Sequence, residues 1–400
     1  MSTRLSGLAL RVVRLGLRMP MQVLWRLDGP VDHEALATMH RNLLAGPLNR
    51  RVRFARVPFA RPVWSPSAEA NPVRISGHTV RAAEVLDWAD AAAAADLDVA
   101  RGLGWELTAT AVDDGTSIVS LVCSHALTDG QGLLAILTLA ARDEHRAEPA
   151  AADRPSLIAD ANDALRGGIR EHTRLAVLRA TAGGTTRSPV AIVRNTVRST
   201  RTRRAPDQWR STVAVQVDTA TIERIATENA GTATGLTLAI LANVARRARG
   251  EIAAADPLAV AVPVSLRAPD DPESSNAMAI ATVALNAQDG RYTDLTAVRQ
   301  CCKAAYSGVA AGDTALGHTD AGFSSVGVFP AEARTAFGPA LGVIGRAISN
   351  SGLRRGHVFV FATWGDGTTS LWFQATGIHL DRTMVGDEFD AWGIDVSHWW

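Results

Sequence analysis

The most informative part of the sequence is residues 123–132, which read CSHALTDGQG. His125 stands four residues before the pair Asp129-Gly130, where an apolar strand pattern gives way to a helical one. A histidine with its pKa near neutrality suits general-base chemistry, and a glycine lets the backbone turn sharply. A histidine held in a loop before a helix-capping aspartate would give the same spacing. We therefore take His125, Asp129 and Gly130 as candidate site residues with both interpretations open.

Two strands lead into this loop and a helix leaves it. Residues 106–112 and 117–123 have strand character, and Asp114-Gly115 between them is a strong hairpin signal. Residues 131–145 then take up the spacing of a helix. Because a sheet holds the loops at its strand ends rigidly, such loops often carry functional side chains.

Strand and helix patterns alternate through both halves of the chain. Further strands are predicted at 21–29, 50–57, 211–218, 257–267, 276–286 and, as a pair joined by a glycine-containing turn, 357–378. Helices are predicted at 31–46, within 80–97, and at 219–231, 235–250, 292–309 and 381–395. The interleaving predicts an α/β fold with mixed sheets in two lobes. We assign residues 1–160 to an N-terminal lobe that carries the His125 loop, 161–211 to a basic crossover, and 212–400 to a C-terminal lobe.

The composition excludes several classes of protein. The chain has 400 residues, of which 47% are hydrophobic and 20% charged, and its formal net charge is +1, so a disordered chain is excluded and no global attraction to nucleic acid or anionic membrane is expected. No apolar run is long enough for a membrane-spanning helix. The three cysteines form neither a disulfide framework nor a zinc pattern, so we expect no metal site and a cytoplasmic location.

Arginines gather at two places. Arg4, Arg11, Arg14 and Arg18 interrupt the apolar residues of the N-terminus, which argues against a secretory signal and leaves a helix packed on the fold or an amphipathic segment that touches lipid or a partner. The stretch 194–204, RNTVRSTRTRR, is typical of a solvated linker, with a docking patch for a phosphorylated or acidic partner as the alternative. It lacks interleaved aromatic residues, so we do not expect nucleic-acid binding.

The loop at residues 124–132 resembles the signature His-His-x-x-x-Asp-Gly of the condensation-domain superfamily of acyltransferases. These include peptide-synthetase condensation domains, polyketide-associated acyltransferases, wax ester synthase/diacylglycerol acyltransferases and chloramphenicol acetyltransferase. The form HALTDGQG is most similar to the wax ester synthase and polyketide-associated branches. Less specific resemblances to the same family occur, in the order in which the family has them, at residues 19–36, 96–107, 261–278 and 348–352.

The resemblance implies two chloramphenicol-acetyltransferase-like lobes with a tunnel between them and the motif at its midpoint. It implies that His125 is the catalytic base and that Ser124 stands where many relatives have the first histidine. It also implies that Asp129 supports the loop by pairing with an arginine, for which Arg267 is the candidate.

Ser349 and Asn350 match the region that lines the acceptor side of the tunnel in relatives. Together with Ser124 and Arg267, they form the substrate-binding set that the resemblance implies.

The implied function is the transfer of an acyl group from a thioester to a small-molecule hydroxyl or amine, in lipid or secondary-metabolite biosynthesis. The thioester would be acyl-CoA or an acyl carrier protein, with no tightly bound cofactor and a monomeric enzyme. One alternative keeps the fold and runs cyclisation, dehydration or hydrolysis from the same base. Another is an inactive docking or scaffold module, with which Ser124 in place of histidine is consistent.

Overall fold

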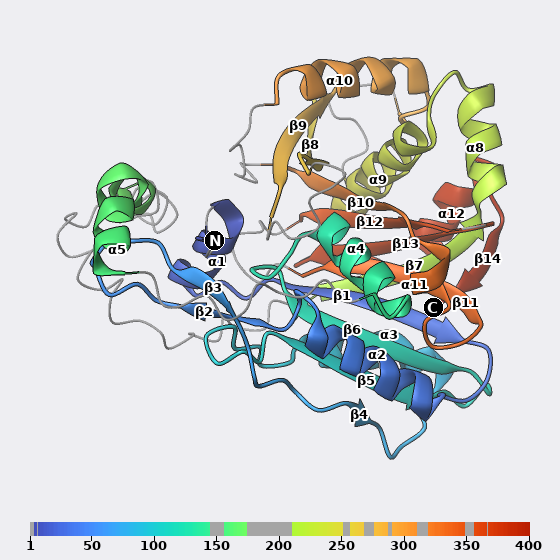
Figure 1. Cartoon of the computed structure of the whole chain (residues 1–400). Coiled ribbons are helices and arrows are strands. Elements are labelled where there is room, and N and C mark those ends of the chain that lie inside the picture. Colours follow the sequence, from blue (N-terminus) through green and yellow to red (C-terminus); the bar gives the residue numbers. More distant parts are fainter. Residues whose placement is uncertain are drawn as a thin grey trace.

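The structure is a computed structural model of the whole chain (Figure 1). It describes residues 4–5, 7–144, 156–173, 210–250, 257–267, 276–286, 290–309, 319–348, 356–365 and 367–400. The basic stretch 194–204, most of the predicted crossover 161–211, and the predicted site residues Ser349 and Asn350 lie outside the described residues.

A five-stranded sheet forms the first lobe, in the order β11-β1-β6-β5-β4. Its strands are β1 (Pro20–Leu27), β4 (Arg74–Ile75), β5 (Trp105–Ala111), β6 (Ser117–Ser124) and β11 (Ala340–Ala347). β1 pairs antiparallel with both β6 and β11, and β5 pairs with β6 through the predicted hairpin turn, where Gly115 has a φ of 86°. The left-handed backbone at this turn favours the glycine that the sequence supplies.

Period-two alternation divides the side chains of this sheet between two cores. Trp25 points to one face, where α2 (His33–Ala45) and α4 (Gly130–Ala141) cover the sheet. Leu24, the preceding residue, points to the other face, where α3 (Val85–Ala93) and the second sheet lie. The same alternation therefore builds both the core of the first lobe and its contact with the second.

A seven-stranded sheet forms the second lobe, in the order β14-β7-β13-β12-β10-β8-β9. Its strands are β7 (Arg210–Asp218), β8 (Leu258–Ser265), β9 (Met278–Leu285), β10 (Ala321–Val328), β12 (Val358–Trp364), β13 (Thr368–Thr376) and β14 (Val396–Trp399). Its outer face is covered by α8 (Thr219–Glu228), α9 (Ala233–Arg249), α10 (Leu295–Ser307) and α12 (Arg382–Asp390), with α9 the most deeply buried. β10 runs parallel to β8 and β12, and the other pairs are antiparallel, so this sheet is mixed as predicted.

The two sheets meet through an apolar cluster between their inner faces. Leu24 and Ile344 of the first sheet pack with Phe361 and the fully buried Trp372 of the second, and Trp400 closes the cluster at the end of the chain. Buried apolar area of this kind stabilises a contact by about 25 cal/mol per Å². The predicted two-lobed α/β architecture with mixed sheets is confirmed.

The predicted lobe boundaries do not follow the observed structure, because β11 lies within residues 212–400 but completes the first sheet. Residues 329–337, which precede β11, also pack on the first lobe. The indole of Trp25 donates to the backbone carbonyl of Ala333 at 2.9 Å and packs edge-on against Phe329 and Phe337. β10, α11 (Ala331–Arg334) and β11 were not predicted from the sequence. The lobes are therefore not contiguous in sequence.

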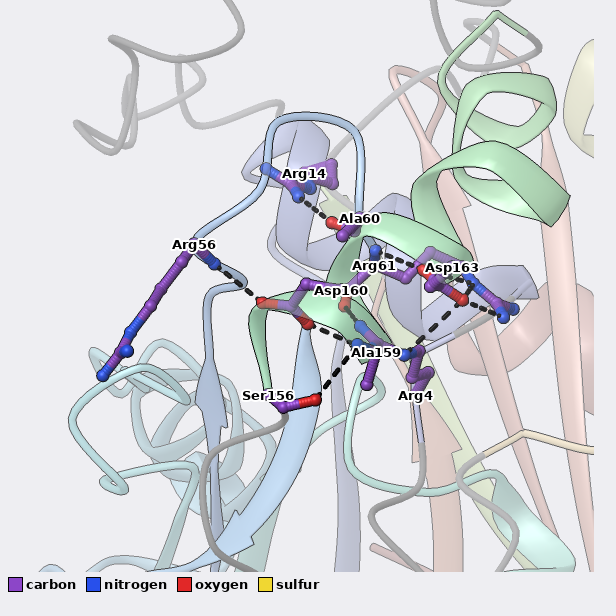
Figure 2. A network of polar contacts seen from close by, with 9 residues as sticks. All are labelled: Arg4, Arg14, Arg56, Ala60, Arg61, Ser156, Ala159, Asp160 and Asp163. Atoms are coloured by element: carbon purple, nitrogen blue, oxygen red, sulfur yellow. Dashed lines mark hydrogen bonds and ion pairs between the residues drawn. The ribbon is translucent and has the colours of Figure 1, made fainter.

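The N-terminal segment is packed on the first lobe, which favours the first of its two interpretations. Leu10 of α1 (Gly7–Leu15) is fully buried, as is Leu5 before it. α5 (Leu157–Asp163) docks beside them through charged groups (Figure 2). The Asp160 carboxylate accepts hydrogen bonds from a guanidinium nitrogen of Arg4 at 2.9 Å and from the backbone N–H of Arg56 at 3.0 Å.

We expect Asp160→Ala to lower the free energy of unfolding by ~3 kcal/mol, because Asp160 is 1% exposed and its loss removes a buried ion pair with Arg4 and leaves the backbone N–H of Arg56 without its acceptor. The matched control is Glu228→Ala, which breaks a surface pair with Arg224 whose side chains are each 56% exposed and should cost less than about 1 kcal/mol. Thermal and urea unfolding of the two variants measure the difference. Equal effects would show that the Asp160 pairs do not stabilise the fold.

Candidate active site

The His125 loop connects the end of β6 to the start of α4, as the sequence predicted. Asp129 is the N-cap residue of α4, and its side chain accepts a hydrogen bond from the backbone N–H of Gly132 at 2.8 Å. N-cap aspartates satisfy a backbone donor that the first helical turn leaves unpaired. Part of the role of Asp129 is therefore that of a cap.

The second carboxylate oxygen of Asp129 reaches across to the other lobe. Oδ2 accepts from Arg267 Nη2 at 2.8 Å and from the backbone N–H of Ala277 at 2.7 Å. These partners stand just beyond the neighbouring ends of β8 and β9. The ion pair is buried, with side-chain exposures of 8% for Arg267 and 6% for Asp129, and the pairing expected between them is present. A buried charge pair with these additional hydrogen bonds holds the loop in one position.

Backbone contacts fix His125 itself. Its N–H donates to the carbonyl of Met19 at 2.8 Å, and its carbonyl accepts from the side-chain amide of Asn276 at 2.8 Å. The residue is 7% exposed, and Nδ1 is buried without a hydrogen-bond partner in the described part of the chain. Asn276 belongs to the segment 261–278 that supported the resemblance, but nothing in its residue type alone marked it as a contact of the histidine.

Burial lowers the pKa of His125 below its ordinary value, because the charged imidazolium loses its hydration. Its own backbone carbonyl, the charge of Asp129 and the Asn276 side chain act in the opposite direction but do not cancel the effect of burial. The ring is therefore neutral at pH 7, the state in which it can accept a proton.

His125 lines a cavity of about 190 Å³ between the two sheets. Most of the wall is apolar and comes from both lobes, including Met21 and Leu134 of the first lobe and Ile280 and Phe361 of the second. Gly130 also lines it, and a Cβ there would lie 3.0 Å from Val326. The residue after Asp129 must therefore be small for the loop to lie this close to β10.

A polar group of side chains interrupts the apolar wall on the strands β1, β11 and β13. Arg346 donates to the side-chain oxygen of Gln22 at 2.7 Å, contacts the carboxylate of Asp90 at 2.5 Å, and stacks over the Trp372 ring at 3.9 Å. Gln374 lines the cavity nearby and is 3% exposed. No pattern in the sequence pointed to these residues, because a buried polar residue inside a strand pattern does not reveal what it faces.

Ser124 and Arg267 are the two predicted substrate-binding residues that the structure describes. Ser124 is nearly buried, and its hydroxyl accepts from the N–H of Ala126 at 3.3 Å, so it supports the turn of the loop. Arg267 contacts Asp129 from the opposite lobe. Burial raises the pKa of the neighbouring Cys123 thiol to about 12, which leaves it unreactive.

The described residues contain no group of three histidine, cysteine, aspartate or glutamate side chains that could hold a metal ion. They also contain no helix that is both long and apolar enough to cross a bilayer.

The fold is that of condensation domains. The first condensation domain of the CDA synthetase is 16% identical, with a TM-score of 0.59, and the match covers 98% of this chain and 94% of that one. The condensation domain of the Monacolin K polyketide synthase MokA is 10% identical, with a TM-score of 0.54, covering 97% and 95% of the two chains.

A third structure with this fold comes from Sorangium cellulosum. The EpoB cyclization-docking bidomain is 12% identical, with a TM-score of 0.57, and the match covers 98% of this chain and 83% of that one. No protein-family model and no curated protein sequence matches the chain. The likeness is thus one of three-dimensional fold.

We expect Gly132→Ala to disturb the loop. A Cβ at residue 132 would collide with the Thr128 hydroxyl and lie 2.7 Å from Arg267 Nη2, so the Asp129–Arg267 pair would have to shift. The matched control is Gly77→Ala, where nothing lies within 4 Å of the new methyl group. The midpoint of thermal unfolding should fall in the first variant and stay constant in the second. A Gly132→Ala protein as stable as the parent would show that the loop tolerates movement.

Proposed function

We propose that this chain catalyses condensation-type acyl transfer, from a thioester of CoA or of an acyl carrier protein to a hydroxyl or amine acceptor. One observation carries the proposal: a buried, neutral imidazole, that of His125, lines a largely apolar cavity between two lobes. The similarly folded condensation domains of the CDA synthetase and of the polyketide synthase MokA support the same class of chemistry.

In this mechanism His125 acts as the general base. The neutral ring accepts the proton of the acceptor's hydroxyl or amine as that group attacks the thioester carbonyl. The carbonyl oxygen becomes an oxyanion, which the backbone amides at the start of α4, near Gly130, would stabilise. The carbon–sulfur bond then breaks, and the imidazolium returns the proton to the thiolate. No covalent acyl-enzyme is formed.

Other residues of the chain would position the reactants. The apolar wall suits the acyl chain, and holding both substrates beside His125 supplies much of the acceleration. Asp129 and Arg267 act through the loop as positioning residues. The assignment of Ser349 and Asn350 to the acceptor side stays a prediction, as does the donor's delivery by CoA or by a carrier protein.

Proteins with this fold can carry a different reaction in their names, as the EpoB cyclization-docking bidomain does. Cyclisation, dehydration or hydrolysis would leave products of different mass from acyl transfer. Mass spectrometry after incubation with acyl-CoAs from acetyl to palmitoyl, each with an alcohol or an amine acceptor, separates these outcomes. Release of free thiol together with the free carboxylic acid, and with no ester or amide, would favour hydrolysis, and no thiol release would favour the docking module.

We expect His125→Ala to lower kcat for thiol release by about 100- to 10,000-fold, the usual contribution of a general base. The matched control is His357→Ala, since His357 is also buried, at 4% exposed, but does not line the cavity. Its kcat should stay within about twofold of the parent protein, with circular dichroism as the check that both variants fold. A His125→Ala enzyme with full turnover would contradict the assigned role.

The pH profile should report the lowered pKa of His125. Because the base must be neutral, kcat/KM should fall only as the pH drops through the pKa of the folded enzyme, which lies below the usual value of about 6.5. The rate should thus be level between about pH 7 and pH 8 after subtraction of uncatalysed thioester hydrolysis. An acid limb centred above pH 7 would rule out a neutral, buried imidazole as the base.

A further inference from the structure

The helix that begins at α5 has its charged side buried and its apolar side exposed. α5 continues through a π-helical turn, η2 (Ala164–Gly168), and the described helix ends at residue 173. Asp160 and Asp163 face the protein, where they bind Arg4, Arg61 and backbone groups of the loop between β2 (Arg50–Arg53) and β3 (Val63–Pro66) (Figure 2). Surface helices of globular proteins normally have the reverse arrangement.

The two aspartates are fixed in this orientation. Burial alone would raise the pKa of Asp163, but hydrogen bonds from the side chain and backbone of Arg61, with the charge of Arg4, hold the pKa below its ordinary value. Gly168 brings the helix against the loop, because a Cβ there would collide with the backbone carbonyl of Phe59. The helix therefore cannot rotate its apolar side inward without breaking these ion pairs.

The exposed side carries large apolar side chains. Ile158, Leu165 and Ile169 are 75%, 76% and 48% exposed, whereas the side chains of the two aspartates on the same helix are only 2% and 8% exposed. The loop from residue 54 to residue 62 adds two exposed aromatic rings. We call the whole set the outward patch: Phe54, Phe59, Leu157, Ile158, Leu165 and Ile169.

The exposed charges beside the outward patch are basic. In the described parts of the loop and the helix, the exposed charged residues are Arg56, Arg166 and Arg170, and the acidic Glu171 is half-buried. Exposed aliphatic and aromatic side chains flanked by arginines are typical of segments that lie in the interface of an anionic bilayer. The net charge of +1 for the whole chain gives no such attraction, so this basic character is local.

We infer that the outward patch is a membrane-docking surface, whose occupant is a bilayer that contains anionic lipid. α5, which carries most of the patch, stands at one end of the molecule, apart from the two large sheets (Figure 1). α1 connects it to the cavity: Arg14 lies over the Phe54 ring at 5.5 Å, and Leu8 lines the cavity. The inference goes beyond the proposed acyl transfer and does not depend on it.

The test is sedimentation of the 400-residue chain with vesicles. The parent protein should bind vesicles of equimolar phosphatidylcholine and phosphatidylglycerol, bind pure phosphatidylcholine more weakly, and lose part of its binding in high salt. The double variant Ile158→Asp with Leu165→Asp should bind at least about tenfold more weakly, since two aliphatic side chains no longer enter the lipid. The matched control is Val328→Asp, because Val328 is 72% exposed but lies on β10, and its binding should equal that of the parent.

A second variant guards against misfolding of the first. Arg166→Glu with Arg170→Glu leaves the apolar residues intact and should abolish the preference for anionic vesicles. A parent protein that does not bind vesicles, or variants that bind as well as the parent, would overturn the inference. So would size-exclusion chromatography in which the parent is a dimer, the Ile158/Leu165 variant is a monomer and neither binds vesicles, because the patch would then contact a second copy.

Discussion

The carboxylate of Asp129 is the group on which the site depends. One oxygen caps α4 in the first lobe, and the other accepts from Arg267 and from the N–H of Ala277 in the second. A carboxylate buried to this degree is stable only when its hydrogen-bonding capacity is used, as it is here. The loop that carries His125 is thus tied to both lobes at once, and the position of the ring depends on how the lobes meet.

The environment of His125 follows from that arrangement. Arg267 forms an ion pair with Asp129, and the cavity wall around the histidine is mostly apolar. Burial is therefore the largest influence on the pKa of His125 and lowers it, so the ring stays neutral. A second arginine, Arg346, links the sheets on the cavity wall through Gln22 of β1 and the Trp372 ring of β13. Two buried guanidinium groups therefore join the lobes around a cavity that is otherwise mostly apolar.

Much of this could be predicted from the sequence. Period-two and helical patterns gave most of the strands and helices, the Asp114-Gly115 turn gave the hairpin, and the resemblance pointed to Arg267 as the partner of Asp129. β10 and β11 were missed because glycines interrupt their strand patterns. Glycine is required at these positions because side chains from other strands lie too close for a Cβ. A Cβ at Gly322 would collide with the Phe359 ring, and one at Gly342 with the Gln216 side chain. Such close approaches are a property of the assembled structure, which a local pattern does not record.

The pairing of β11 with the sheet of the first lobe affects how the protein folds during synthesis. β1 pairs with β6 on one side and with β11 on the other, and β11 comes from the last quarter of the chain. During synthesis on the ribosome, β1 emerges with one edge open and stays so until β11 has been translated. An open strand edge is prone to pair with other chains, so the nascent chain needs protection until β11 has been made. Because residues so distant in sequence must meet, closure of this sheet is a slow, late event in folding.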